Sequence, residues 1–238
     1  MLHALNPSTM FRAAFGLTFV IAVFAFMAAT PDNTFEFIRL GGIIMGTASL
    51  AVVLLTIKPV LRFAHQVSFA DTWCFPWLDG RWEGEIKSNW PTIKAMMDAA
   101  KDDIPPFDVL TQDPPNGSVQ AHKVEVTIQS GLFDIEIKLH VPETTNNSDS
   151  VFARPQRVPG QPPRLYYVYK QTSSDPLPLT DVRSHLGAAC LEYDRNTGEL
   201  RGDYWTNRNR ERGLNTAGSI TLKRVTTRRR RKPAARRL

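Results

Sequence analysis

Two apolar runs near the N-terminus constrain the fold of this chain more than any other feature. They cover residues 13–29 and 40–57, and neither contains a charged residue. Each approaches the ~17–25 residues that a helix needs to cross a bilayer. Backbone polar groups in lipid must be satisfied within the segment itself, so both runs are expected to be helical. Residues 30–39 between them include Pro31 and Asn33, which favour a turn. The sequence therefore predicts a two-helix transmembrane hairpin over residues 1–62 and a linker over residues 63–79.

Basic residues flank the two runs unequally. Arg12, Lys58 and Arg62 lie beside the ends that share one side of a hairpin, whereas Arg39 lies near the other side. Because basic residues favour the cytoplasmic side of a membrane, we expect a multi-pass protein with both termini in the cytosol. A second interpretation of the first run is a signal peptide that is cleaved near Ala29.

A GxxxG motif lies in the second apolar run, at Gly42 and Gly46. Small residues allow transmembrane helices to approach closely, because lipid provides no hydrophobic drive for their association. The motif has two interpretations: it packs the two helices of the hairpin, or it forms contacts between protomers. The second makes Gly42 and Gly46 candidate oligomerisation residues.

The net charge of +6 comes from the C-terminal tail. Residues 226–238 contain seven basic residues and no acidic one, so the rest of the chain carries about −1. A conventional nucleic-acid-binding domain needs its positive surface on folded structure, and we expect no DNA or RNA partner. We expect the tail to be disordered. Its basic run is a candidate for contact with an anionic membrane surface: Arg228, Arg229, Arg230, Arg231 and Lys232.

From residue 80 onward the sequence alternates with the period of a β-strand. Val124, Val126 and Ile128, for example, alternate with polar residues. About eight such segments follow one another through turn-rich loops, with no amphipathic helix long enough to connect parallel strands. The prediction is a membrane-anchored all-β protein with a small antiparallel β-barrel, or a sandwich, over residues 80–225. Residues 91–117 form an excursion with a short helix over 92–103. An eight-stranded barrel has room inside for one small ligand.

The densest group of polar and aromatic residues lies at residues 198–213. On a strand, Tyr204, Thr206 and Arg208 share the face of Leu200, which we expect to be buried. An arginine that faces a barrel interior needs an anion or a carboxylate. An aromatic ring, a hydroxyl and a guanidinium in a row suit a nucleotide, because the ring stacks on a base and the guanidinium binds phosphate.

Two other strands contribute candidate ligand-binding residues. Ser88 and Asn89 lie where the strand that starts at residue 80 reaches a rim of the barrel. Tyr169 has the same strand parity as Leu165, so we expect it to face inward, opposite to Tyr166.

Several competing interpretations remain open on the residues alone. Arg208 can extend past its strand end and pair with Glu199 or Glu211. The protein can be a membrane-tethered, lipocalin-like carrier, which predicts an apolar interior without Arg208. It can also be an anchor or assembly subunit, which predicts a filled barrel. No catalytic motif and no metal-ligand spacing among the five histidines is present, so we expect no enzyme, no metal and no cofactor.

The order of these features resembles a known family, the two-transmembrane, β-strand-rich effectors of bacterial cyclic-oligonucleotide antiphage systems (CBASS). The resemblance rests on the two apolar runs and on three short motifs: Gly80, Trp82 and Gly84; His185 and Gly187; Gly202, Tyr204, Thr206 and Arg208. The excursion at 91–117 and the basic tail depart from the family pattern.

The resemblance implies a function. A cytosolic barrel would sense a cyclic dinucleotide made by a partner nucleotidyltransferase during phage infection. Binding of this activating ligand would drive homo-oligomerisation of the hairpins and disrupt the bacterial inner membrane, so that the infected cell stops growing or dies.

Overall fold

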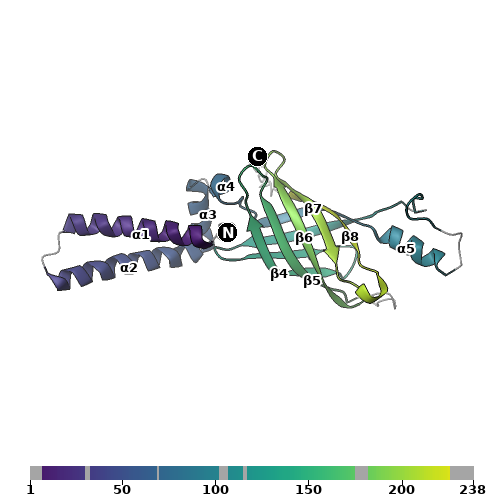
Figure 1. The fold of residues 1–238 in the computed structure, drawn as a ribbon, viewed down its shortest axis with the longest axis horizontal. Coiled ribbons are helices and arrows are strands. Elements are labelled where there is room, and N and C mark those ends of the chain that lie inside the picture. Colours follow the sequence, from purple (N-terminus) through teal and green to yellow (C-terminus); the bar gives the residue numbers. More distant parts are fainter. Residues whose placement is uncertain are drawn as a thin grey trace, which may run out of the picture.

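The computed structural model describes residues 7–29, 33–68, 70–101, 107–114, 117–174 and 182–225. The basic tail predicted over residues 226–238 lies outside these ranges. The described residues form an N-terminal helical hairpin, two short helices that follow it, and a β-barrel with a further helix and a 3₁₀-turn between its strands (Figure 1).

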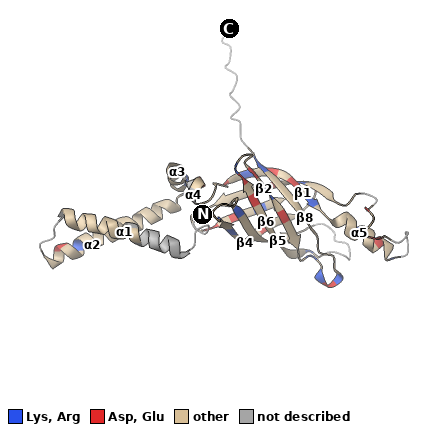
Figure 2. Cartoon of the chain, turned by 45° about the horizontal axis from the view of Figure 1, so that its top comes forward, with Lys and Arg blue, Asp and Glu red and all other residues tan. Residues whose placement is uncertain are grey.

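Helices α1 (Pro7–Ala29) and α2 (Thr34–Thr56) lie side by side and form the hairpin (Figure 1). The Asn33 side chain caps α2 by accepting a hydrogen bond from the Glu36 backbone. Helix α2 is long and apolar enough to cross a membrane, and residues 18–28 of α1 form a shorter apolar stretch. Charged residues are frequent on the barrel, whereas between residues 18 and 56 of the hairpin the described charged residues are Glu36 and Arg39, near its tip (Figure 2).

Among the residues whose side chains the structure describes, none of α1 lies in tight contact with the GxxxG residues of α2. Gly42 and Gly46 are exposed, and a Cβ built on either would meet no atom of the described residues within 4 Å. The structure therefore does not support the interpretation in which this motif packs the hairpin. Its role in contacts between protomers stays a prediction.

Helix α3 (Lys58–Val67) begins directly after α2 and crosses the boundary that the sequence placed between residues 62 and 63. Pro59 occupies its first turn, where the missing N–H is tolerated. A short helix, α4 (Ala70–Trp73), follows, and residues 75–79 then lead into the barrel.

Eight antiparallel strands form a closed barrel, which confirms the predicted fold and excludes a sandwich. Each strand pairs with the next, and β1 pairs with β8 to close the barrel, with Gly84 opposite Leu222. The strands are β1 (Gly80–Ser88), β2 (Gln120–Ser130), β3 (Ile135–His140), β4 (Asn147–Gln156), β5 (Arg164–Thr172), β6 (Ser184–Asp194), β7 (Glu199–Thr206) and β8 (Ala217–Arg224). Because the eight paired strands close into a barrel, alternate residues along each strand point into one interior.

The helix of the excursion, α5 (Trp90–Ala99), starts two residues earlier and ends four residues earlier than predicted. It follows β1 at the end of the barrel that lies away from the hairpin (Figure 1). A 3₁₀-turn, η2 (Arg210–Arg212), lies between β7 and β8 at the same end of the barrel.

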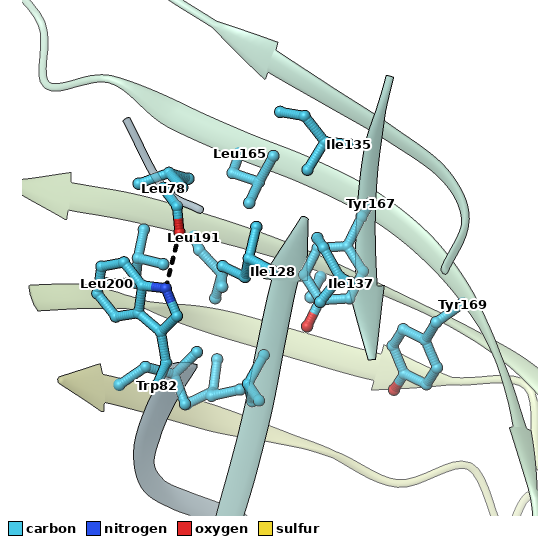
Figure 3. Packing of buried hydrophobic residues seen from close by; sticks show 14 of the residues in the cluster. Leu78, Trp82, Ile128, Ile135, Ile137, Leu165, Tyr167, Tyr169, Leu191 and Leu200 are labelled. Carbon is cyan, nitrogen blue, oxygen red and sulfur yellow. Dashed lines mark hydrogen bonds between the residues drawn. The ribbon is translucent and has the colours of Figure 1, made fainter. Parts of the chain in front are cut away.

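The hydrophobic core fills the end of the barrel that is nearer the hairpin. Phe75 and Leu78, from the segment that precedes β1, are fully buried among strand residues such as Leu165 and Leu200. The Trp82 indole N–H donates a hydrogen bond of 2.9 Å to the Leu78 carbonyl oxygen (Figure 3). An apolar plug therefore closes this end, and any internal space must lie toward the other.

Candidate ligand-binding site

A cavity of about 370 Å³ lies inside the barrel at the end away from the hairpin. Its wall includes Ser88 at the end of β1, Gln120 at the start of β2, Ser148 near the start of β4 and Thr206 at the end of β7. A volume of this size lies within the range of ~300–1,000 Å³ that is typical of small-molecule sites.

Five of the six predicted ligand-binding residues line this cavity: Ser88, Tyr169, Tyr204, Thr206 and Arg208. They come from β1, β5, β7 and the segment after β7, which are far apart in the sequence. Strand parity placed Tyr169, Tyr204 and Thr206 inward, because each shares a face with a buried residue of its own strand, whereas Ser88 was selected as a rim residue and Arg208 lies two residues beyond the end of β7. The structure brings these residues together, and ligand binding by them stays a proposal.

Asn89, the sixth candidate, does not line the cavity. Its side-chain oxygen accepts a hydrogen bond of 2.9 Å from the Ala217 backbone N–H. Its own N–H donates to the Ala217 carbonyl oxygen at 3.0 Å. Asn89 therefore continues the pairing of β1 with β8 beyond the last strand residue. The sequence placed it correctly at the rim but could not show that its polar groups bind backbone.

The Thr206 hydroxyl is part of the cavity wall and is already hydrogen-bonded. It accepts from the Thr216 backbone N–H at 3.0 Å and lies 3.1 Å from the Thr216 carbonyl oxygen. Both residues are buried. Thr206 therefore holds the two ends of the 207–216 segment together, and this segment carries Arg208.

Arg208 brings positive charge to the cavity. Its guanidinium carbon lies 5.8 Å from the centre of the Trp90 ring, a cation–π distance. Glu199, one of its two possible partners from the sequence, instead pairs with Lys223 at 2.8 Å and with Arg201. Among the described residues that line the cavity, none is an aspartate or glutamate. The described wall therefore favours an anionic ligand over a cationic one.

Three tyrosines supply aromatic surface and hydroxyl groups. Burial raises the pKa of Tyr167 and Tyr169 far above the usual value, and it also raises the pKa of Tyr204. For Tyr204 a hydrogen bond with Ser88 and the charge of Arg208 act in the opposite direction, but burial is the larger effect. All three phenols are therefore protonated at neutral pH and can donate hydrogen bonds.

Gly187 makes room for the ring of Tyr169, its direct partner in the pairing of β5 with β6. A Cβ on Gly187 would lie 2.3 Å from Cζ of Tyr169 and 2.5 Å from its hydroxyl oxygen. Gly202 has a different role, because a Cβ there would lie 1.8 Å from the Cys190 carbonyl oxygen. Some residues of the short motifs therefore shape the cavity, as Gly187 does, and others allow the strands to pack, as Gly202 does.

Sequence reasoning did not select several polar residues of the cavity: Gln120, His122, Thr144, Asn146, Ser148, Gln171, His185 and Thr216. Most lie at strand ends, where the alternating pattern is short. For His122 a signal was present, since it extends the inward parity of Val124 by one step and pairs with Ile86 of β1. Its Nδ1 lies 3.8 Å from a carboxylate oxygen of Glu143.

Two comparisons with known proteins cover the barrel. A family model described as the Cap15 cyclic dinucleotide receptor domain matches residues 110–224, which include strands β2 to β8. The CD-NTase-associated protein 15 of Escherichia albertii is 24% identical over 218 residues, which cover 89% of this chain and 93% of that protein. Both matches confirm the resemblance that the sequence motifs indicated.

Proposed function

We propose that the chain is a CBASS membrane effector with a Cap15-type cyclic dinucleotide receptor domain, and that its ligand binds in the cavity of the barrel. The observation that carries this proposal is the placement of Arg208 beside Trp90 and Tyr204 in one cavity. A cyclic dinucleotide carries two negative charges and two bases. A guanidinium can bind a phosphate and aromatic rings can stack on bases, so the described wall is chemically suited to it.

The cavity favours this function over the two non-enzymatic alternatives. An apolar carrier predicts a lining without Arg208, but Arg208 and many polar side chains line the cavity. An anchor without a ligand predicts a filled barrel, but about 370 Å³ is open. We also propose that the protein acts by binding and not by catalysis.

We further propose how ligand binding in the barrel leads to disruption of the membrane. A ligand shifts an assembly only if it binds the assembled state more tightly than the separate one. We propose that the cyclic dinucleotide, made by a partner nucleotidyltransferase, changes the rim of the barrel or bridges two barrels. This change would favour contacts between the hairpins of neighbouring protomers. Gly42 and Gly46, which are exposed on α2, would lie on the face of the helix that forms these contacts. Oligomers would then disrupt the inner membrane, with barrel and termini cytosolic, and cause abortive infection.

A pair of arginine variants tests the binding site. Arg208→Ala removes one charge-assisted hydrogen-bond donor, worth ~1.5–3 kcal/mol, so we expect the Kd to rise by about 10- to 150-fold. Arg210→Ala is the matched control, since it removes the same charge from the exposed η2 turn two residues away. Calorimetry on the full chain in detergent would measure both. Equal affinity of the Arg208→Ala variant and the unchanged protein, with the barrel folded, would show that the site is wrong.

A further inference from the structure

Helix α3 has an exposed apolar face that the proposed function does not use. Val60, Phe63 and Val67 follow one another at helical spacing, so they lie on one side of the helix. Their side chains are 36%, 67% and 60% exposed. Three large apolar residues at these exposures form a continuous stripe along a helix of ten residues.

The opposite face of α3 is fixed to the base of the barrel. Leu61 and His65 are buried, and His65 Nε2 lies 2.9 Å from the carbonyl oxygen of Phe75, which belongs to the apolar plug. Lys58, at the start of α3, forms an ion pair of 2.7 Å with Asp79, the residue before β1. The exposed stripe therefore has a fixed orientation with respect to the barrel.

The position of α3 along the chain places the stripe beside the membrane. Helix α2 has 23 residues, which correspond to a length of about 34 Å at ~1.5 Å per residue. This length exceeds the ~30 Å of a bilayer's hydrocarbon core, so the C-terminal end of α2 reaches the headgroup layer if α2 crosses. Only Ile57 separates α2 from α3, and α3 then runs across the direction of the hairpin (Figure 1).

We propose that α3 is an interfacial helix that lies in the headgroup layer of the membrane, with Val60, Phe63 and Val67 inserted toward the acyl chains. The exposed side chain of Arg62 provides charge that complements the lipid phosphates. An amphipathic helix of this kind buries its apolar face about 5–10 Å into the boundary between headgroups and acyl chains. This inference rests on the proposed crossing of the membrane by α2.

In this position α3 has a mechanical role. One face of the helix contacts lipid and the other contacts the plug of the barrel, so the barrel is held at a fixed height and tilt above the bilayer. Barrels held in this way present the same wall to their neighbours, which limits how two copies can meet.

Site-directed spin labels on the full chain in lipid nanodiscs test this placement. The nanodiscs contain phosphatidylethanolamine and phosphatidylglycerol, and the native Cys74 and Cys190 are replaced by alanine. Labels are attached at Phe63→Cys on the stripe, at Gln66→Cys on the polar face and at Leu50→Cys within α2. The accessibility of each label to oxygen, which partitions into lipid, is compared with its accessibility to a water-soluble nickel chelate.

We expect the label at residue 63 to be accessible to oxygen, protected from the nickel chelate and about 5–10 Å below the phosphate level. The label at residue 66 should be accessible to the nickel chelate, and the label at residue 50 should be deep in lipid. Val67→Cys provides a second position on the stripe if the Phe63→Cys variant does not fold.

Three results would overturn the inference. If stripe labels are as accessible to the nickel chelate as residue 66 while residue 50 is deep, α3 stands clear of the bilayer but the proposed anchoring by α2 holds. If the stripe labels are shielded from both reagents, protein covers the stripe, as in a contact with a second copy. If residue 50 is also in water, the proposed membrane anchoring fails together with the inference.

Discussion

The contact between Gly187 and Tyr169 makes the shape of the cavity testable by a single methyl group. In the Gly187→Ala variant the new Cβ would lie 2.3 Å from Cζ of Tyr169, more than 1 Å closer than an ordinary contact. Gly187 does not have a positive φ, so alanine fits its backbone without strain. The backbone of β6 is held by pairing on both sides, with β5 and β7, so the Tyr169 ring must move.

The size of the effect follows from where the ring can go. Overpacking of a core costs ~1–3 kcal/mol, and the open cavity beside Tyr169 allows the ring to turn, so we expect about 1 kcal/mol. For a domain of this size, this loss corresponds to a decrease in Tm of roughly 4 °C. The displaced ring would occupy space in the cavity, so the Kd for the ligand should rise by about tenfold or more, which is about 1.4 kcal/mol.

A double-mutant cycle isolates this contact. In the Tyr169→Ala background the ring is absent, so Gly187→Ala should cost nothing or should stabilise slightly, because alanine restricts the unfolded chain. Thermal unfolding of the full chain in detergent, followed by tryptophan fluorescence, gives the four Tm values. If Gly187→Ala lowers Tm equally in both backgrounds, the steric argument is wrong.

Two further predictions concern other contacts of the barrel. Thr206→Val leaves the buried Thr216 N–H without its acceptor and should destabilise the barrel by ~1–3 kcal/mol, as measured by Tm; an unchanged Tm would contradict the assigned bonding. Lys223 and Arg201 hold the pKa of Glu199 below its usual value. This stabilisation is present above the ordinary glutamate pKa of about 4.3 and is lost as pH falls through the lower folded pKa. The Tm difference between the unchanged protein and Glu199→Gln should therefore shrink as pH is lowered from 7 to 3. A constant difference would refute the stabilisation by the ionised Glu199 carboxylate.

The barrel could be predicted from the sequence because its signal is local. Alternation such as Val124–Val126–Ile128 fixes which face of a strand is buried, and short turns between strands imply antiparallel pairing. The same parity, extended from Leu200, placed Tyr204 and Thr206 toward the interior, and the structure confirms their orientation. The strand pattern predicts a barrel but is also compatible with a sandwich, and the pairing of β1 with β8 in the structure decides between them.

The features that could not be predicted from the sequence depend on contacts between distant segments, which the alternation of apolar and polar residues does not encode. The pairing of Ala217 with Asn89 decides that this side chain binds backbone and does not face the cavity. A register shift between Ser150 and Phe152 interrupts the alternation of β4, so parity could not be carried through that strand. The helical character of α3 was also missed, because a ten-residue helix is held by packing, here through His65, more than by its own sequence.

Calorimetric titration of the full chain with a panel of cyclic di- and trinucleotides tests the central claim most directly. We expect one cyclic dinucleotide to bind with a submicromolar Kd and one molecule per barrel cavity, and we expect added phosphate salts to compete weakly. If the barrel is folded and no member of the panel binds, the cavity is not a cyclic dinucleotide site.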